Sequence, residues 1–211
     1  GSAYSADKTQ NVYTLNINKS QAAFGYMHVS KDGVLNVDGR TIDTNKYKND
    51  GANVDFYAGD FIVNGNATFN NVDAWAKYTK MSVDHADGVL NLNGDTKYEA
   101  SIHNGGTSST SLKFWKAGKV NVAKNATMEI DNGTVLVEGA ELNIAGYATA
   151  KGVITGNGTI NFTEKEAKLA AQEGLTINHK FGDSYKVERI NGVYGIYHYV
   201  ASVNDVNYES L

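Results

Sequence analysis

The sequence predicts an all-β chain, and within that class a parallel β-helix, in which short strands wind around a common hydrophobic axis. Two observations carry this prediction. An apolar/polar alternation ending in a turn of Asn, Asp or Gly occurs at residues 29–39, at 83–94 and, in degraded form, at 122–133. Such a strand-and-turn unit cannot bury its apolar face alone and must stack on copies of itself. The chain also lacks proline, which would remove a hydrogen bond from strands that have two neighbours.

The alternation from Tyr13 to Phe162 has the period of two that is typical of β-strands. Between Val120 and Phe162, turn sequences separate strands of about four residues, and three strands with their turns make a coil of about 20 residues. Asn and Gly supply the positive φ angles that tight corners require. We therefore expect a right-handed parallel β-helix over residues 11–162, preceded by a tag and a disordered start at 1–10.

Three stretches break the alternation and are predicted to be insertions: residues 40–53, 72–80 and 95–115. Insertions in repeat arrays often project on one face and carry binding, and exposed Trp and Tyr dominate contact hot spots. The candidate partner-binding residues are therefore the insertion aromatics Tyr47, Trp75, Tyr78, Tyr98 and Trp115. The alternative is that these rings only seal the flank of the solenoid against solvent.

The chemistry of the chain changes after Phe162. Thr163 to Glu166 form a capping box and Gly174 is a helix stop, which predicts a short helix. Asn191-Gly192 lies between two alternating segments and predicts a β-hairpin. Residues 163–200 are thus expected to be a helix and hairpin that cap the open end of the solenoid, where an uncovered strand edge invites aggregation.

Composition excludes several classes of function. The chain of 211 residues has no cysteine and a net charge of −4 without a basic run, so disulfides, thiolate metal sites and nucleic-acid binding are not expected. No apolar run approaches the roughly 20 residues of a membrane-spanning helix, so membrane insertion is not expected either.

Catalysis and metal binding also find little support. Glycoside hydrolysis needs two carboxylates about 5 to 9.5 Å apart, and the best candidates are Asp55 with Asp60 and Asp84 with Asp87 beside His85. Asp84 and Asp87, however, occupy a turn position where Asp is favoured for conformational reasons alone. The five histidines are dispersed, and no twelve-residue calcium loop is present. We expect no enzyme activity, no cofactor and no metal.

A resemblance adds to this interpretation. The matching residues are Tyr185-Lys186-Val187-Glu188, Asn191-Gly192-Val193-Tyr194, Val200-Ala201-Ser202-Val203-Asn204 and Tyr208-Glu209-Ser210-Leu211. With them, the segment from Gly174 onward resembles the junction between repeats in large cell-surface proteins of Gram-positive gut bacteria. The body at 120–162 is similar to pectate-lyase-like, adhesin-type superhelices and autotransporter passenger domains, with which the chain shares Asn-Ala-Thr and Asn-Gly-Thr turns at Asn66, Asn125, Asn132 and Asn157.

The resemblance implies a function. Residues 201–211 would be a linker or the start of the next repeat, and the chain would be one module among neighbouring repeats on the bacterial cell surface. Proteins of this kind act as adhesins that bind host proteins, and some are immunoglobulin-binding superantigens. We expect a non-catalytic extracellular module that binds an immunoglobulin or a mucosal glycoprotein through the solenoid face and the aromatic insertions. Two alternatives are a carbohydrate-binding or polysaccharide-degrading β-helix and an inert spacer.

Overall fold

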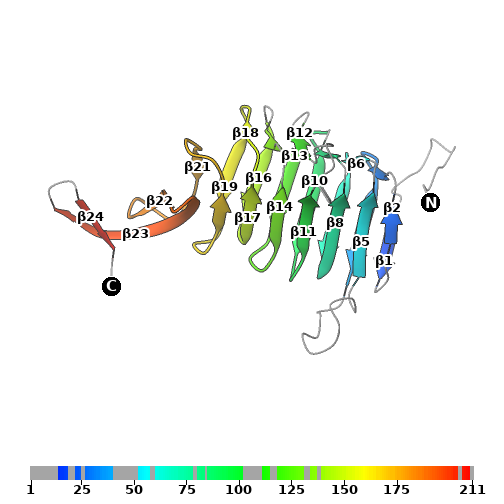
Figure 1. Cartoon of the computed structure of the whole chain (residues 1–211), viewed down its shortest axis with the longest axis horizontal. Helices are drawn as coiled ribbons and strands as arrows, with labels where there is room; N and C mark the ends of the chain where they lie inside the picture. The colour runs from blue at the N-terminus through cyan, green and yellow to red at the C-terminus, as the bar shows by residue number, and fades with distance from the viewer. Residues whose placement is uncertain are drawn as a thin grey trace.

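A computed structural model describes residues 14–18, 22–24, 27–39, 52–57, 60–77, 80–83, 85–101, 111–114, 118–130, 134–136, 139–203 and 206–209. These residues form strands joined by turns, and no helix occurs among them. In particular, this part of the chain contains no helix that is long and apolar enough to cross a membrane. The strands lie side by side along the long axis, with the first described strands at one end and the last described strands at the other (Figure 1).

The strands form three sheets. Sheet A has the order β1 (Thr14–Asn18), β4 (Val34–Asp38), β7 (Asn66–Asn70), β10 (Gly88–Asn93), β13 (Gly118–Val122), β16 (Glu141–Ile144), β19 (Thr159–Phe162) and β21 (Ile177–Asn178). Sheet B has the order β2 (Ala22–Phe24), β5 (Ala52–Tyr57), β8 (Val72–Lys77), β11 (Lys97–Ser101), β14 (Thr127–Ile130), β17 (Tyr147–Ala150), β20 (Lys168–Ala170), β23 (Val193–Val203) and β22 (Tyr185–Ile190), with β24 (Val206–Glu209) pairing β23. Sheet C contains β3 (Met27–Val29), β6 (Asp60–Val63), β9 (Lys80–Val83), β12 (Ser111–Phe114), β15 (Thr134–Val135) and β18 (Ile154–Thr155).

From β1 to β20, successive strands visit the three sheets in turn, so each sheet receives every third strand over this part of the chain. All pairings in sheets A and C are parallel, as are those of sheet B up to β20. This topology is consistent with a parallel β-helix, and it confirms the prediction of an all-β chain built from parallel sheets.

The core lies along the axis of the coil. In sheet A, buried residues alternate with half-buried ones, as in the pattern of β10 from Gly88 to Asn93. One row of inward side chains stacks in register through Leu35, Ala67, Leu90, Val120, Leu142, Ile160 and Ile177. Each of these is at most 9% exposed, and burial of their apolar side chains stabilises the fold.

Two of the predicted insertions consist in part of β-strands that belong to the stacked sheets. Residues 72–77 form β8 and pair with both β5 and β11, and residues 97–101 and 111–114 form β11 and β12. The prediction of insertions over 72–80 and 95–115 was therefore wrong for these strands. Tyr98 is the clearest case, because its ring is fully buried in the core, whereas the sequence prediction placed it on an exposed insertion. Residues 40–51, 78–79, 102–110 and 115–117 lie outside the described residues, as do 1–10.

The predicted helix after Phe162 is absent. Residues 164–166 form a turn, and Lys168–Ala170 forms β20, which pairs parallel with β17. Ala167, Leu169 and Ala171 are all buried, and this spacing of two suits a strand. The helix prediction was wrong because the edge of β17 offers backbone hydrogen bonds that outweigh local helix propensity.

The predicted hairpin is present at the C-terminal end of the coil. β22 and β23 pair antiparallel around Asn191 and Gly192, whose φ angles of 51° and 86° fit a tight hairpin turn. β23 also pairs antiparallel with β20 and so covers the edge of β20, the last parallel strand of sheet B. It continues past residue 200 to Val203 and pairs with β24, extending from the end of the coil (Figure 1). The boundary predicted at 200/201 stays a prediction.

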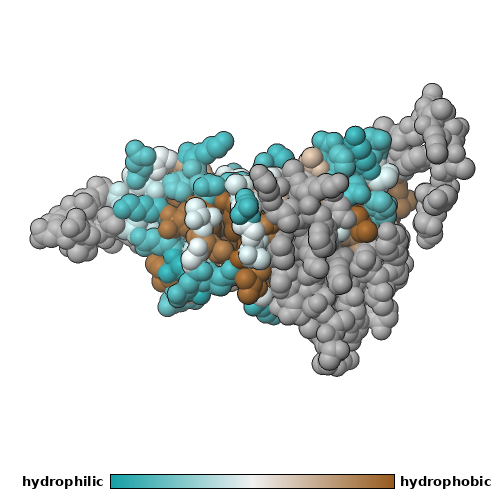
Figure 2. Space-filling model, turned by 90° about the horizontal axis from the view of Figure 1, so that it is seen from above, coloured by the Kyte–Doolittle hydropathy of each residue, from teal (hydrophilic) through white to brown (hydrophobic). Residues whose placement is uncertain are grey.

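Among the described residues, most exposed side chains are polar. Figure 2 shows the coil from above, with brown atoms in the middle of the coloured surface and teal atoms around them. The large apolar side chains that are exposed among the described residues are Leu15, Tyr147, Val153 and Ile190. They belong to different strands and loops, and they do not define one apolar docking patch.

Tyr98 gives a test of the core. Burial raises the pKa of its phenol well above the usual value, and its hydroxyl has no hydrogen-bond partner among the described residues. An unpaired buried hydroxyl is destabilising by about 1 to 3 kcal/mol. We therefore expect Tyr98→Phe to raise the free energy of unfolding by about 1 kcal/mol, measured by urea denaturation. A loss of stability instead would mean that the hydroxyl is hydrogen-bonded.

Candidate functional site

The outer face of sheet A carries a row of asparagines. The sequence places an Asn between two inward apolar residues in most of these strands, as in Leu142-Asn143-Ile144. Because side chains alternate across a strand, this Asn points away from the core. The backbone register aligns the row across the sheet as Asn16, Asn36, Thr68, Asn91, Asn121, Asn143, Asn161 and Asn178. We call this row the Asn ladder.

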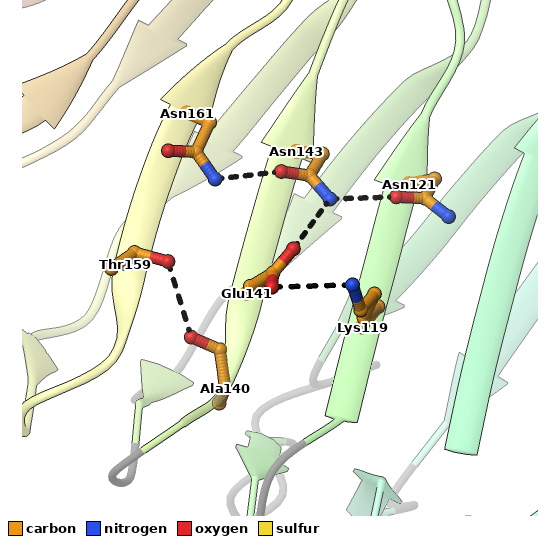
Figure 3. A network of polar contacts seen from close by, with 7 residues as sticks. All are labelled: Lys119, Asn121, Ala140, Glu141, Asn143, Thr159 and Asn161. Atoms are coloured by element: carbon orange, nitrogen blue, oxygen red, sulfur yellow. Dashed lines mark hydrogen bonds and ion pairs between the residues drawn. The ribbon is translucent and has the colours of Figure 1, made fainter. Parts of the chain in front are cut away.

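The amides of the Asn ladder are hydrogen-bonded along the axis of the coil. The Nδ2 of Asn121 donates to the Oδ1 of Asn91 at 2.8 Å, and that of Asn143 donates to Asn121 at 2.9 Å. In the same way, the Nδ2 of Asn161 donates to the Oδ1 of Asn143 at 2.8 Å, and that of Asn178 donates to the Oδ1 of Asn161 at 3.3 Å. The amides of Asn121, Asn143 and Asn161 lie in one line on one side of the sheet (Figure 3). Each bond restrains a side chain that is free to rotate in an isolated strand.

The ladder is interrupted once. At Thr68 the amide is replaced by a hydroxyl, and the Nδ2 of Asn91 lies 3.4 Å from both the Oγ1 of Thr68 and the Oδ1 of Asn66. Beyond this position, Asn36 again donates to Asn16 at 3.0 Å. The ladder is therefore strongest from Asn91 to Asn178.

A second polar row lies beside the strongest part of the ladder. Lys119 Nζ is 3.2 Å from a carboxylate oxygen of Glu141, whose other oxygen accepts a hydrogen bond from Asn143 at 3.4 Å. On the next strand, the hydroxyl of Thr159 donates to the carbonyl oxygen of Ala140 at 3.5 Å. These side chains project on the same side as the ladder (Figure 3). Together with the ladder they form a broader polar surface, in which the carboxylate of Glu141 is held by Lys119 and Asn143.

A hollow lies at the C-terminal end of this surface and has a volume of about 530 Å³. Its lining comes from β16, β19, β21 and the segment that follows β21. We call it the end hollow, and its lining residues are Glu141, Asn143, Thr159, Asn161, Phe162, Thr163, Asn178, His179, Lys180 and Phe181. The end of the Asn ladder is therefore part of a concave site.

Aromatic rings form one side of the end hollow. The rings of His179 and Phe181 are stacked with centroids 5.9 Å apart and planes within 10°. Phe181 contacts the ring of Tyr185 edge to face at 6.2 Å, and Tyr185 stacks on His198 at 4.5 Å. Lys165 Nζ lies 4.2 Å from the centroid of the Tyr185 ring and donates to its hydroxyl at 2.6 Å. The hairpin therefore supports the aromatic side of the end hollow.

Two carboxyl groups elsewhere in the coil have shifted pKa values. Burial raises the pKa of Asp73, against the opposing effect of Lys97. A backbone hydrogen bond, followed by the charge of Lys124, lowers the pKa of the exposed Glu166. Neither residue lines the end hollow.

The structure does not gather the five predicted partner-binding aromatics into one described site. Tyr47, Tyr78 and Trp115 lie outside the described residues. Trp75 lies on β8, where its backbone is paired with Asp55 and Glu99, and its side chain is not described. Tyr98 is buried and does not reach the surface. The other four residues stay a prediction.

The described residues show no pair of carboxylates at the candidate catalytic positions. The side chains of Asp55 and Asp60 and the whole of Asp84 lie outside what is described. His85 Nδ1 accepts a hydrogen bond from the backbone N–H of Asp87 at 3.1 Å and lies 3.5 Å from its carboxylate, an arrangement that suits the turn predicted there. Among the described residues, no group of three His, Asp or Glu side chains is placed to hold a metal ion.

Sequence reasoning missed the Asn ladder and the end hollow. The signal for the ladder is visible, because an asparagine recurs at the centre of apolar-Asn-apolar triplets from Leu15 to Phe162. No comparable signal predicts that His179 and Phe181 lie beside Asn161.

No family model, curated protein or solved structure matches the chain.

Proposed function

We propose that this chain is a non-catalytic display and adhesion module of a repetitive, extracellular bacterial surface protein. Its scaffold would be a right-handed parallel β-helix, the hand that parallel crossover connections normally adopt. Its partner would be a host protein, such as an immunoglobulin or a mucosal glycoprotein. The binding surface would be the outer face of sheet A. The observation that carries this proposal is the Asn ladder.

A hydrogen-bonded ladder favours binding because it reduces the cost of ordering side chains. Immobilising a flexible side chain at an interface costs about 0.5 to 1.5 kcal/mol, and the amides from Asn91 to Asn178 are already restrained. Eight strands spaced about 4.8 Å apart make a straight face about 34 Å long. Such a face offers a partner a fixed array of hydrogen-bond donors and acceptors.

The insertions are proposed as a second source of contacts. Tyr47, Trp75, Tyr78 and Trp115 keep this role, and Tyr98 does not because its ring is buried. If the insertions carry binding, Trp75→Ala or Trp115→Ala will lose the partner. Retention by both variants would leave the sheet A face as the binding surface.

The test of the sheet A face is capture of serum and mucus proteins on the immobilised module. The variant carries Thr68→Arg and Val89→Arg, which add two bulky cations at half-buried outward positions. The matched control is Thr149→Arg, an outward position of sheet B. We expect the double variant to lose the captured partner and the control to retain it, with both melting near the wild-type temperature.

Other outcomes have a clear meaning. Capture by the double variant at the wild-type level would contradict the proposed surface. A wild-type module that captures nothing would contradict the adhesion role and leave the spacer role.

A further inference from the structure

We propose that the end hollow binds a neutral saccharide, such as a terminal hexose unit of a host glycan. This inference rests on the proposed function, because it names the part of a glycoprotein partner that the module recognises. Three properties of the end hollow carry it: the polar floor, the aromatic side and the balance of charge.

The floor presents groups that match sugar hydroxyls. A hydroxyl both donates and accepts hydrogen bonds, and a carboxamide does the same through separate atoms at a fixed spacing. Asn143, Asn161 and Asn178 line the end hollow, and their orientation is set by the hydrogen bonds of the Asn ladder. Neighbouring hydroxyls of a pyranose therefore meet donors and acceptors that need little reordering.

The aromatic side suits the other face of a sugar. A pyranose ring carries its C–H bonds on faces that are less polar than its edge, and such faces are buried against aromatic rings. The stacked rings of His179 and Phe181 provide this surface, and Tyr185 contacts Phe181 edge to face. An apolar wall with a few fixed polar groups is the usual composition of a small-molecule site, and the volume of about 530 Å³ lies within the usual range of about 300 to 1,000 Å³.

The charges favour a neutral ligand. Among the lining residues, Glu141 contributes one carboxylate and Lys180 one ammonium group. The carboxylate is bound by Lys119 and Asn143 and keeps acceptor capacity for hydroxyl groups. With one negative and one positive side chain, the lining residues carry no net formal charge with which a charged sugar would pair.

The test is binding of the whole module to an array of neutral and sialylated glycans, followed by calorimetric titration with the best neutral oligosaccharide. One variant is Phe181→Ala, which removes an aromatic wall. A second is Thr159→Phe, which fills the end hollow at an exposed position without replacing a ladder amide. The matched control is Thr149→Phe on sheet B. We expect Phe181→Ala and Thr159→Phe each to weaken binding by about tenfold or more, whereas Thr149→Phe leaves it unchanged.

Each other result overturns the inference. If no glycan binds, or if only sialylated glycans bind, the end hollow is not a neutral-saccharide site. If a neutral glycan binds equally to Phe181→Ala and Thr159→Phe, the glycan binds elsewhere. These failures are distinct from failure of the proposed function, because the Thr68→Arg and Val89→Arg variant tests protein capture by the sheet A face independently. Treating the captured partner with periodate, which destroys sugar rings, then shows whether capture depends on its glycans.

Discussion

Replacing Gly146 with alanine is expected to destabilise the fold by about 3 kcal/mol or more. Gly146 lies at the corner between β16 and β17, directly against the turn of the preceding coil. A Cβ atom at this position would lie 2.3 Å from the carbonyl oxygens of both Ala123 and Ala126. These are backbone atoms of a buried stack, so the clash is relieved only by separating two coils. Urea denaturation monitored by circular dichroism measures the loss.

A glycine at a different kind of turn provides the control. Gly174 has a φ of +82°, and a Cβ atom there would meet no other atom within 4 Å, so Gly174→Ala introduces conformational strain without a clash. We expect this variant to lose only about 1 kcal/mol. Equal and small losses at both positions would contradict close stacking of the coils at Gly146. Gly65 has the same relation to the carbonyl oxygens of Ser30 and Gly33, at 2.2 and 2.3 Å, which indicates that this contact recurs along the coil.

Truncating Phe69 is expected to cost about 3 to 5 kcal/mol. Its side chain is fully buried, stacks on Phe61 with centroids 5.9 Å apart, and is in register with Val37 and Leu92. Phe69→Ala removes most of a large apolar side chain from the interior and leaves a cavity that the rigid coil cannot close. Because each coil contacts only its neighbours, the loss also weakens the stacking of the coils on either side.

The free energy of unfolding of Phe69→Ala should be compared with that of two controls. Phe69→Leu keeps most of the apolar volume, and we expect it to cost about 1.5 kcal/mol. Val153→Ala changes a side chain that is 61% exposed, and we expect an effect within about 0.5 kcal/mol. A Phe69→Ala variant as stable as Val153→Ala would show that Phe69 does not lie in a packed interior.

The sequence predicted the parts of the fold that depend on local pattern. The alternation from Val120 to Phe162 predicted strands because inward and outward residues are cleanly separated there. Asn191-Gly192 predicted the hairpin because only a few residue types adopt two successive positive φ angles.

The failures came where tertiary contacts outweigh local pattern. Residues 163–174 have good helix signals, but the neighbouring edge of β17 and the burial of Leu169 favour a strand. Tyr98 lies among polar residues that do not look like a core strand, yet the coil places its ring inside.

The candidate site was harder to predict because it depends on register. Consecutive hydrogen-bonded asparagines of the ladder are separated by 30 residues between Asn91 and Asn121 but by only 17 between Asn161 and Asn178. A constant repeat of about 20 residues does not align them. Their alignment is set by the register in which each strand pairs with the next, which depends on the length of the chain between the two strands. The end hollow also needs the path of the chain after β21, which no short motif specifies.

The most direct test of the central claim, that stacked coils hold the outer amides of sheet A in a fixed array, is hydrogen exchange of asparagine side-chain amides by NMR. The reference is Asn157, which lies in an exposed turn. We predict that Nδ2 protons of Asn121, Asn143 and Asn161 exchange about tenfold more slowly than those of Asn157, since a hydrogen bond must open before exchange. Exchange of all four side chains at the same rate would contradict the Asn ladder and, with it, the proposed binding face.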